Sequence, residues 1–261
     1  PIPAPPAPEP AGSLRVTLDP DRTALLLGPA LRVFRARIEE LLLAACAPAL
    51  AAVTGGRAAA LLLEGHGRDH WLPGVNLERT VGWFTSLTMV ALPWAAEPAA
   101  AVAAVKTTLR HLDGLRLEAA LADGQPEEAH AVMFNFFGRL DAALPPGLFS
   151  PAPETAGRDR DPLAPLPVGL VLNGGVLAGQ LGFELAWDGV RVGAVNAQAV
   201  AADFAARLEA LADRARTETP VALIPADFPL AGLSPGETAQ MERRFGVELA
   251  EALPCAPLQE G

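Results

Sequence analysis

The sequence predicts an α/β protein, a two-layer sandwich in which helices cover a mixed β-sheet. Three observations lead to this fold class. Short apolar runs typical of strands alternate along the chain with longer segments of helical periodicity. A hairpin pattern near the end of that alternation adds an antiparallel pair of strands. Apolar residues make up 51% of the 261 residues and charged residues 19%, which is enough for a sizeable core.

The first predicted elements are a strand and two helices. Residues 14–18 alternate between apolar and polar side chains, as a half-buried strand does. Asp19 is a suitable cap for a short helix over residues 23–27. Apolar side chains then recur at helical spacing over residues 29–53, and Gly55-Gly56 follows them. We therefore expect a single long helix over 29–53.

Two strands, a helix and a third strand are predicted next. Residues 58–63 form a short apolar run, which is typical of a buried strand. Residues 86–92 form a second such run, which ends at Pro93. The alanine-rich stretch 95–123 is expected to be mostly helical, with a break at Asp113-Gly114, and residues 130–136 to be a strand.

The last part of the alternation is predicted to be a hairpin followed by a helix. Residues 142–167 are rich in Pro, Gly and charge, and are expected to be a long loop. Two strands, 168–173 and 180–187, flank the sequence Asn173-Gly174-Gly175, which indicates the turn of a hairpin. Residues 196–217 have the pattern of an amphipathic helix.

Composition divides the chain into three parts. Residues 1–13 are a proline-rich linker, because proline fixes φ and removes a hydrogen-bond donor. Residues 14–219 hold the alternating strands and helices. Residues 220–261 are a mostly irregular tail with a short helix near 236–245.

Charge and cysteine content exclude several classes of function. Twenty basic and 30 acidic residues give a net charge of −10, which argues against nucleic acid and anionic lipid as partners. No apolar run approaches the ~20 residues that span a bilayer. Cys46 and Cys255 are too few for a disulfide framework or a metal site, so we expect a cytoplasmic protein without a metal.

The segment Glu64-Gly-His-Gly-Arg-Asp69 is the strongest candidate for a chemical site. It follows directly on a predicted buried strand, and its two glycines permit a sharp turn or the close approach of a ligand. Glu64 and His66 would share one face if the strand continued, which makes an acid/base site. A structural alternative is that Glu64 forms an ion pair with Arg68 or Arg79.

Several segments together resemble a known family. Residues 64–68 and the sequence Asn-Leu-Glu-Arg-Thr-Val-Gly-Trp-Phe-Thr-Ser at 76–86 closely resemble the epimerization domains of nonribosomal peptide synthetases, members of the condensation-domain superfamily. Residues 134–141, Phe-Asn-Phe-Phe-Gly-Arg-Leu-Asp, are similar to a further motif of that family. Residues 172–176 and 179–187 resemble its late hairpin.

The resemblance implies a single lobe with the chloramphenicol-acetyltransferase-like fold. It covers roughly the C-terminal half of a family member. The family's N-terminal lobe carries the motif His-His-x-x-x-Asp-Gly, which is not found here, so we expect a truncated domain. Within the tail 220–261, residues 227–234 resemble the connector after such domains, and residues 253–261 resemble the first motif of a following condensation domain.

The resemblance also implies an activity, namely the epimerization of an aminoacyl or peptidyl thioester held on a carrier protein. Glu64 would be one of the two proton-transfer groups that inversion requires, and the other lobe's histidine the second. Our leading hypothesis is that the chain alone is catalytically inactive and serves as a structural or recruitment module. The alternatives are an epimerase completed by a separate N-terminal lobe and a relic spacer.

Substrate contacts are expected from a set of residues in the matching segments: His66, Arg68, Arg79, Trp83, Asn135 and Phe136. Trp83 could instead pack beneath the strand end, and Phe136 replaces a family tyrosine, so a phenol donor is lost. No cofactor is expected, because the substrate would arrive on the phosphopantetheine arm of a carrier domain. The expected partners are that carrier protein and a condensation domain. A trans-acting tailoring enzyme and a second copy in a homodimer are further candidate partners.

Overall fold

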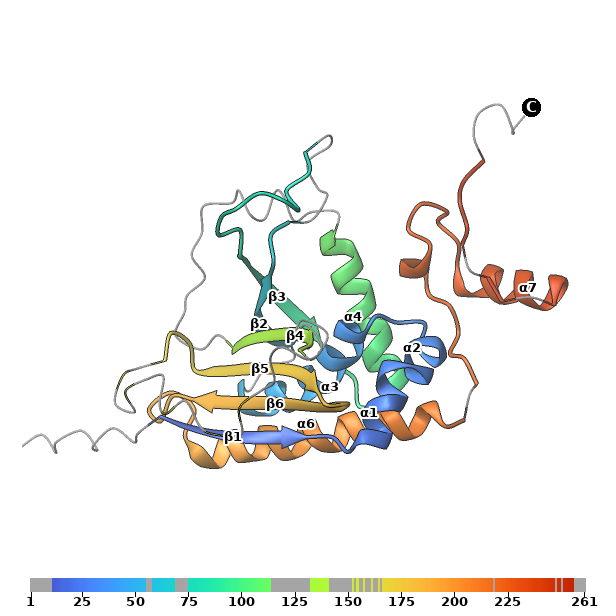
Figure 1. Cartoon of the computed structure of the whole chain (residues 1–261). Coiled ribbons are helices and arrows are strands. Elements are labelled where there is room, and N and C mark those ends of the chain that lie inside the picture. The colour runs from blue at the N-terminus through green and yellow to red at the C-terminus, as the bar shows by residue number, and fades with distance from the viewer. Residues whose placement is uncertain are drawn as a thin grey trace, which may run out of the picture.

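In the computed structural model of the chain, strands and helices alternate as the sequence predicts (Figure 1). The structure describes residues 11–54, 58–68, 75–113, 132–140, 166–217, 219–246, 248–249 and 251–255, together with 152, 154, 157, 161 and 164. Its strands are β1 Gly12–Thr17, β2 Ala58–Gly65, β3 Ser86–Pro93, β4 Val132–Arg139, β5 Leu170–Leu177 and β6 Gln180–Trp187. Its helices are α1 Pro20–Leu27, α2 Pro29–Val33, α3 Ile38–Thr54, α4 Pro98–Asp113, α6 Ala194–Ala215, α7 Pro235–Phe245 and the 3-10 turn η3 Pro225–Asp227.

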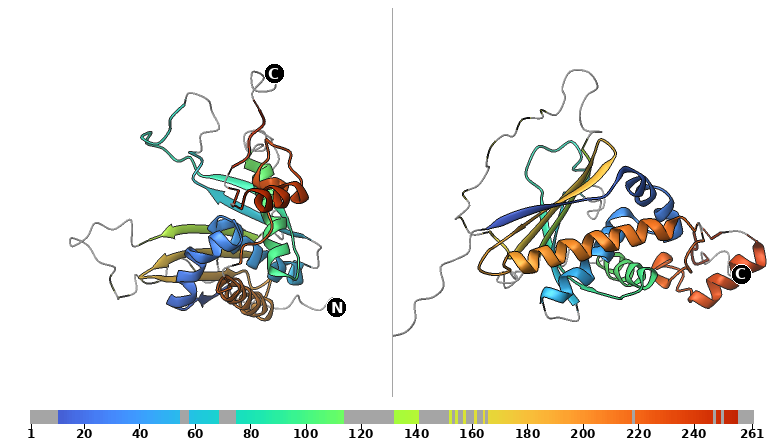
Figure 2. Two further views of the ribbon diagram at one scale, coloured as in Figure 1. Left: turned by 90° about the vertical axis from the view of Figure 1, so that its right-hand side faces the viewer. Right: turned by 90° about the horizontal axis from the view of Figure 1, so that it is seen from below.

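The described strands form one mixed sheet in the order β1-β6-β5-β4-β2-β3. Strand β4 runs parallel to both of its neighbours, β2 and β5, whereas the other pairs are antiparallel. Helices α3, α4 and α6 pack on the same side of this sheet (Figures 1 and 2). The predicted α/β sandwich with a mixed sheet is therefore confirmed.

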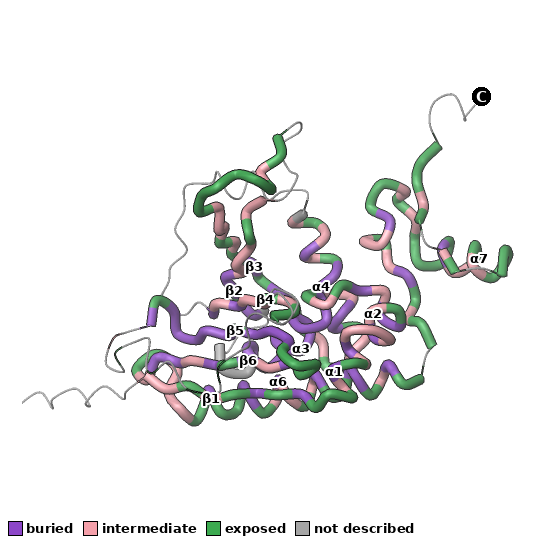
Figure 3. The backbone as a smooth tube through the Cα atoms, viewed as in Figure 1, coloured by how far each residue is buried: buried purple, intermediate pink, exposed green. Residues whose placement is uncertain are grey.

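The core lies between the sheet and this helical layer. Alternation along β6 shows the division: Leu181, Phe183 and Leu185 are buried, whereas Gln180 and Glu184 are exposed on the other face. The Phe183 ring lies 5.2 Å from the ring of Phe204 on α6 and 5.6 Å from that of Phe134 on β4. Figure 3 shows the buried residues gathered along the central strands and the helices beneath them. The opposite face, which we call the open face, carries the even residues of β2 and β6 and the odd residues of β1, β4 and β5.

The expectation of one helix over residues 29–53 is wrong. The structure divides it into α2 and α3, separated by the turn at residues 34–37. Arg35 has a φ of 50°, a left-handed conformation that a helix interior cannot contain. The apolar spacing continues across the break because Phe34 and Leu41 are both fully buried, so periodicity alone could not reveal it.

The expected hairpin is present, but its turn is not at Asn173-Gly174-Gly175. Strand β5 continues through these residues, and the chain reverses at Ala178-Gly179, where φ is 50° and 75°. Gly174 is required by packing, because a Cβ there would lie 2.2 Å from the ring of Phe183. The glycines therefore serve packing within a strand, which a sequence pattern cannot distinguish from a turn.

The remaining predicted elements agree with the structure to within a few residues. Helix α4 begins at Pro98 and is described up to Asp113. Residues 114–123 lie outside the described residues, so the break at Asp113-Gly114 stays a prediction. Strand β4 extends to Arg139, beyond the predicted end at 136. Most of the predicted loop 142–167 also lies outside the described residues.

The segment 219–249, which we call the connector, is fastened to the lobe rather than leaving it. The amide of Val221 donates to the carbonyl of Val33 at 2.7 Å. Asp227 accepts from the buried Lys106 of α4 at 2.8 Å, and Arg35 pairs with Glu242 of α7 at 2.9 Å. A capping box of Ser234 and Glu237 begins α7. The connector is thus held along most of its length by polar contacts to α2, α4 and the turn between α2 and α3.

Candidate active site

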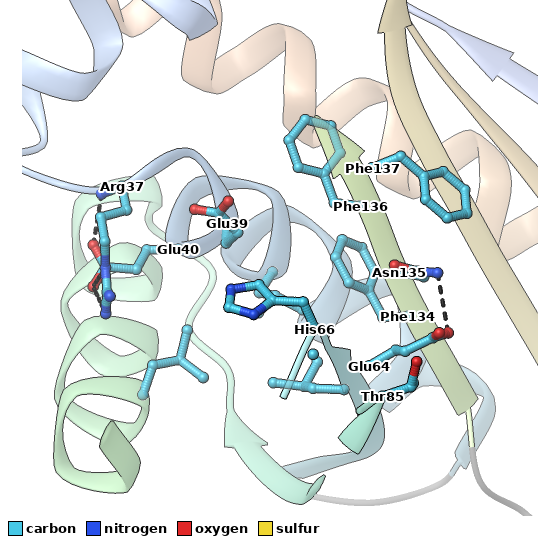
Figure 4. A pocket seen from close by; sticks show the side chains of 14 residues that line it. Arg37, Glu39, Glu40, Glu64, His66, Thr85, Phe134, Asn135, Phe136 and Phe137 are labelled. Atoms are coloured by element: carbon cyan, nitrogen blue, oxygen red, sulfur yellow. Dashed lines mark hydrogen bonds and ion pairs between the residues drawn. The ribbon is translucent and has the colours of Figure 1, made fainter. Parts of the chain in front are cut away.

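A pocket of about 650 Å³ lies where strands β2 and β4 end, between them and the start of α3 (Figure 4). Parallel strands bring their carboxyl ends to the same edge of a sheet, which explains why residues far apart in sequence meet here. The polar or titratable side chains that line the pocket are Glu64, His66, Thr85, Asn135, Arg37, Glu39 and Glu40.

Glu64 is held in this pocket by an amide side chain from the neighbouring strand. Leu61 and Leu63 of β2 contribute to the core, so alternation turns Glu64 to the open face. Asn135 of β4 donates from Nδ2 to Glu64 Oε2 at 3.0 Å. Among the described residues, the carboxylate is therefore held by an amide, and not by the ion pair with Arg68 or Arg79 that we considered as the structural alternative.

His66 and Arg68 lie just beyond the end of β2 and have different surroundings. The side chain of His66 lines the pocket, and its Nδ1 accepts a hydrogen bond from the backbone amide of Arg68 at 3.0 Å. The guanidinium of Arg68 turns away, donates to the carbonyls of residues 77, 80 and 82, and lies 4.4 Å from the ring of Phe84. Gly67 has a φ of 62°, and a Cβ there would overlap the carbonyl of Phe84. Arg68 therefore organises the loop after the strand.

Two further candidates, Arg79 and Trp83, do not line the pocket. Both are exposed, and Trp83 retains 89% of its accessible surface. The expectation that Trp83 packs beneath the strand end is therefore wrong. A role for either side chain in substrate binding stays a prediction.

Phe136 and Phe137 form an aromatic part of the pocket wall. Phe136 packs against the core and stacks on Phe183, with ring centroids 6.2 Å apart. Phe137, which is 54% exposed, points to the open face beside it (Figure 4). Because Phe136 has no hydroxyl group, the amide of Asn135 is the polar contribution of β4 to this wall.

Sequence reasoning missed the contribution of α3. Arg37, Glu39 and Glu40 reach the pocket because the turn at residues 34–37 ends α2 and starts a new helix there. Glu40 is fully buried and accepts from the backbone amide of Arg37 at 2.7 Å and from Nε of Arg110 at 2.8 Å. Burial alone would raise the pKa of Glu40, but these hydrogen bonds outweigh it and hold the pKa below its ordinary value.

A network of four charges continues from Glu40 into the lobe. Arg110 pairs with both Glu40 and Asp227, and Asp227 also pairs with Lys106. Lys106 is 1% exposed, and burial lowers the pKa of its ammonium group despite the carboxylate of Asp227. The pocket wall and the connector therefore share one network, in which each buried charge has a partner of opposite sign.

The described residues contain neither a metal-binding cluster nor a helix suited to a membrane. In this part of the chain, no three His, Cys, Asp or Glu side chains gather as a metal site would require. None of the described helices is both long and apolar enough to cross a lipid bilayer. Cys46 is completely buried, which raises the pKa of its thiol, and Cys255 is exposed.

The lobe is an open mixed sheet that helices cover on one face, with Glu64 at the end of an inner strand. Its fold is similar to one lobe of solved epimerization and condensation domains. The solved epimerization domain from the third module of tyrocidine synthetase B matches with a TM-score of 0.67 at 22% identity, over 80% of this chain and 49% of that one. The X-domain in its complex with OxyB from teicoplanin biosynthesis matches with a TM-score of 0.53 at 18% identity, over 78% and 47%.

The sequence relatives of the chain are subunits of nonribosomal peptide synthetases. It is 34% identical to a segment of chondramide synthase cmdD from Chondromyces crocatus, over all of this chain and 7% of that protein. It is 30% identical to a segment of a linear gramicidin synthase from Brevibacillus parabrevis, over 95% of this chain and 5% of that protein. No family model matches. The chain thus resembles a small segment of much longer synthetases, and spans about half of a solved epimerization domain.

Proposed function

We propose that this lobe supplies one of the two proton-transfer groups of an epimerization site, and that it does not invert a stereocentre by itself. The substrate would be an aminoacyl or peptidyl thioester on the phosphopantetheine arm of a carrier domain. The observation that supports this proposal is the position of Glu64, whose carboxylate lines an open pocket and is oriented by Asn135 at 3.0 Å.

The chemistry of the proposed site follows from the two oxygens of Glu64. Asn135 engages Oε2, which orients the carboxylate toward the pocket. A carboxylate oxygen accepts the proton from Cα, and the electron pair of the broken C–H bond moves into the thioester carbonyl to form an enolate. Return of the same proton from Glu64 restores the starting configuration. Inversion requires a proton from a donor on the opposite face of the enolate.

Among the described residues that line the pocket, Glu39 is the candidate for that second role that the test includes. His66 follows Glu64 by two residues at the end of β2. Its side chain lies on the same side of the chain as that of Glu64, about 7 Å farther along. Arg37 and Glu40 are engaged with each other, and Glu40 also with Arg110. A second lobe, with the family's paired histidines, is the source that the family resemblance suggests.

The test uses a carrier domain loaded with an L-aminoacyl or L-peptidyl thioester in D2O. We expect the chain alone to give no D-configured product. Addition of a separately produced N-terminal lobe containing His-His-x-x-x-Asp-Gly should give the D-isomer with deuterium at Cα. Glu64→Gln should reduce its formation by about 100-fold or more, the range of general acid–base catalysis. Glu251→Gln, at an exposed position in the tail, is the matched control.

Two results would contradict the proposal. One is D-configured product from the chain alone, and if Glu39→Gln abolished it, Glu39 would be the second proton donor across the pocket. The other is full activity of the Glu64→Gln chain with the added lobe.

Recruitment of another protein is a second candidate function. It is favoured by the likeness in fold to the X-domain, which has been solved in complex with OxyB. A pull-down with the flanking carrier domain and the tailoring enzymes encoded beside the parent synthetase tests it. Specific retention of a tailoring enzyme, unaffected by Glu64→Gln, would support recruitment, and retention of none would count against it.

A further inference from the structure

A second cavity, of about 750 Å³, lies on the open face beside the pocket of Glu64. It extends over strands β5, β6 and β1, and its walls include Leu140, Leu177 and Gln180. Phe137 lines both cavities, so they adjoin at strand β4. A volume of this size is typical of pockets that bind small molecules or short peptides.

Polar side chains join the two cavities along one level of the sheet. The pairing of strands places Asn135 opposite Asn173, Asn173 opposite Glu184, and Glu184 opposite Arg15. Glu64 accepts a hydrogen bond from Asn135 and extends this row, so that it crosses five strands. We call these five residues the polar row. Asn173, Glu184 and Arg15 are all exposed on the open face and line the second cavity.

Two glycines lie in the floor of the second cavity, where the side chains of Leu140 and Arg15 approach them. Gly175 and Gly182 face each other in the pairing of β5 with β6. Gly182 has no positive φ, and a Cβ there would make only an ordinary contact, 3.4 Å from Arg15. Neither backbone conformation nor packing therefore requires glycine at 182, although glycine within a strand costs about 0.5–1 kcal/mol. Glycine at such a position often marks the close approach of a ligand or another backbone.

We propose that the second cavity binds the peptide part of a peptidyl thioester whose reacting Cα lies at Glu64. This inference rests on the proposed function and assigns it a substrate class, a peptidyl rather than a single aminoacyl group. The amides of Asn173 and Gln180 can donate to and accept from a peptide backbone. Arg15 and Glu184 carry opposite charges, which leaves the cavity nearly neutral and disfavours a polyanionic ligand such as nucleic acid.

The geometry of the sheet sets the length of this peptide. From β2, which carries Glu64, to β6, which carries Glu184, there are three spacings between neighbouring strands. At ~4.8 Å each they span roughly 14 Å, the length of about four residues of an extended peptide at ~3.3 Å per residue. Binding should therefore improve with peptide length up to about four residues and then level off.

The experiment measures the binding of synthetic peptidyl pantetheines of one to six residues to the chain by calorimetry. We expect the affinity to rise at least 10-fold between one and four residues. Gly182→Phe, which fills the floor, should return the four-residue compound to the affinity of the single aminoacyl compound. Val195→Phe adds the same ring at a position that is 79% exposed on α6, and should leave every affinity unchanged.

A photolabel on the unaltered chain gives a second measurement that needs no variant. A diazirine on the amino-terminal residue of the four-residue compound should label residues 12–17 or 173–184. Affinities that do not depend on peptide length, or labelling only outside these strands, would overturn the inference.

Glu64→Gln separates this inference from the proposed function. The variant should keep the dependence of affinity on peptide length, because the second cavity does not include Glu64. If proton transfer failed in every assay but this dependence persisted, the peptide site would stand and the proposed function would fall. If proton transfer occurred equally with aminoacyl and peptidyl substrates and the affinities were the same, only the peptide site would be wrong.

Discussion

Glu40 connects the pocket to the interior of the lobe at the scale of a single residue. It is fully buried, yet it lines the pocket and accepts hydrogen bonds from Arg37 and Arg110. A buried carboxylate with two cationic partners is stable only while all three remain, because any group left alone keeps its cost of desolvation. The rim of the pocket is therefore held by the same charge network that lies beneath it.

We predict that Glu40→Gln lowers the free energy of unfolding at pH 7 by about 3 kcal/mol, since Arg110 loses a buried partner. The hydrogen bonds hold the pKa of Glu40 below the ordinary 4.5. Its stabilising contribution is therefore complete above about pH 4.5 and is lost as the pH falls through the lower pKa of the folded state. Urea unfolding of both proteins at several pH values between 7 and 3 should show the difference shrinking in acid.

The control for this prediction is the neighbouring glutamate. Glu39 is exposed, so Glu39→Gln should change the stability by no more than ~0.5 kcal/mol at any pH. A difference between the unaltered chain and Glu40→Gln that stays constant down to pH 3 would show that the charge of Glu40 does not stabilise the fold.

At the scale of elements, the hairpin of β5 and β6 builds most of the second cavity. Its turn places Ala178 at a φ of 50°, which costs an alanine roughly 1–2 kcal/mol. We predict that Ala178→Asn stabilises the protein by about 0.5–1 kcal/mol, because Asn-Gly is favoured in two-residue turns of this kind. Thermal unfolding of the variant should occur at a higher temperature.

An exposed alanine in a regular helix provides the comparison for that turn. Ala202→Asn on α6 should destabilise the protein by up to ~0.7 kcal/mol, because asparagine is the poorer helix former. If both substitutions shifted the unfolding temperature in the same direction, the left-handed conformation of residue 178 would not be the cause.

The strands and helices could largely be predicted from sequence, whereas their ends depended on tertiary contacts. The break between α2 and α3 escaped because apolar side chains keep helical spacing on both sides of Arg35. The turn of the hairpin was misplaced because Gly174 is fixed by the ring of Phe183, a contact between neighbouring strands. The residues around Gly174 in the sequence do not reveal which side chain of the neighbouring strand packs against it.

The candidate site was predictable in part, for the same physical reason. Glu64 and Asn135 each stand in a recognisable motif, so both could be named from the sequence. Their hydrogen bond follows from the parallel pairing of β2 with β4, which joins residues 71 positions apart. The second cavity was not predicted, although part of it lies in the recognised hairpin, because its polar row is assembled from separate strands by register.

At the scale of the whole molecule, the connector is part of the folded lobe. Asp227, whose side chain is 6% exposed, pairs with Lys106 and Arg110 of α4, and Arg35 pairs with Glu242 of α7. Lys106 is the one lysine in the sequence, and it lies in the interior, where its ammonium group donates to Asp227 and to the carbonyl of Phe34. The connector thus supplies, in Asp227, the carboxylate that pairs with the buried ammonium group of Lys106.

We predict that Asp227→Ala lowers the free energy of unfolding by about 3–5 kcal/mol, because it leaves the buried Lys106 without its carboxylate. Hydrogen exchange should also become faster in residues 221–246, since one of their attachments is lost. The double variant Lys106→Met, Asp227→Ala removes the stranded charge and should recover part of the lost stability. Equal stability of the two variants would mean that the ammonium group is not the source of the cost.

The fastening of the connector also determines the reach of any domain joined behind it. A free tether starting at the end of α6 would let such a domain explore a wide volume, and its local concentration near the lobe would fall as that volume grew. Because Val221, Asp227 and Glu242 are attached to the lobe, a tether could begin only after α7. A fused neighbour would then stay within a smaller radius, at a higher effective concentration.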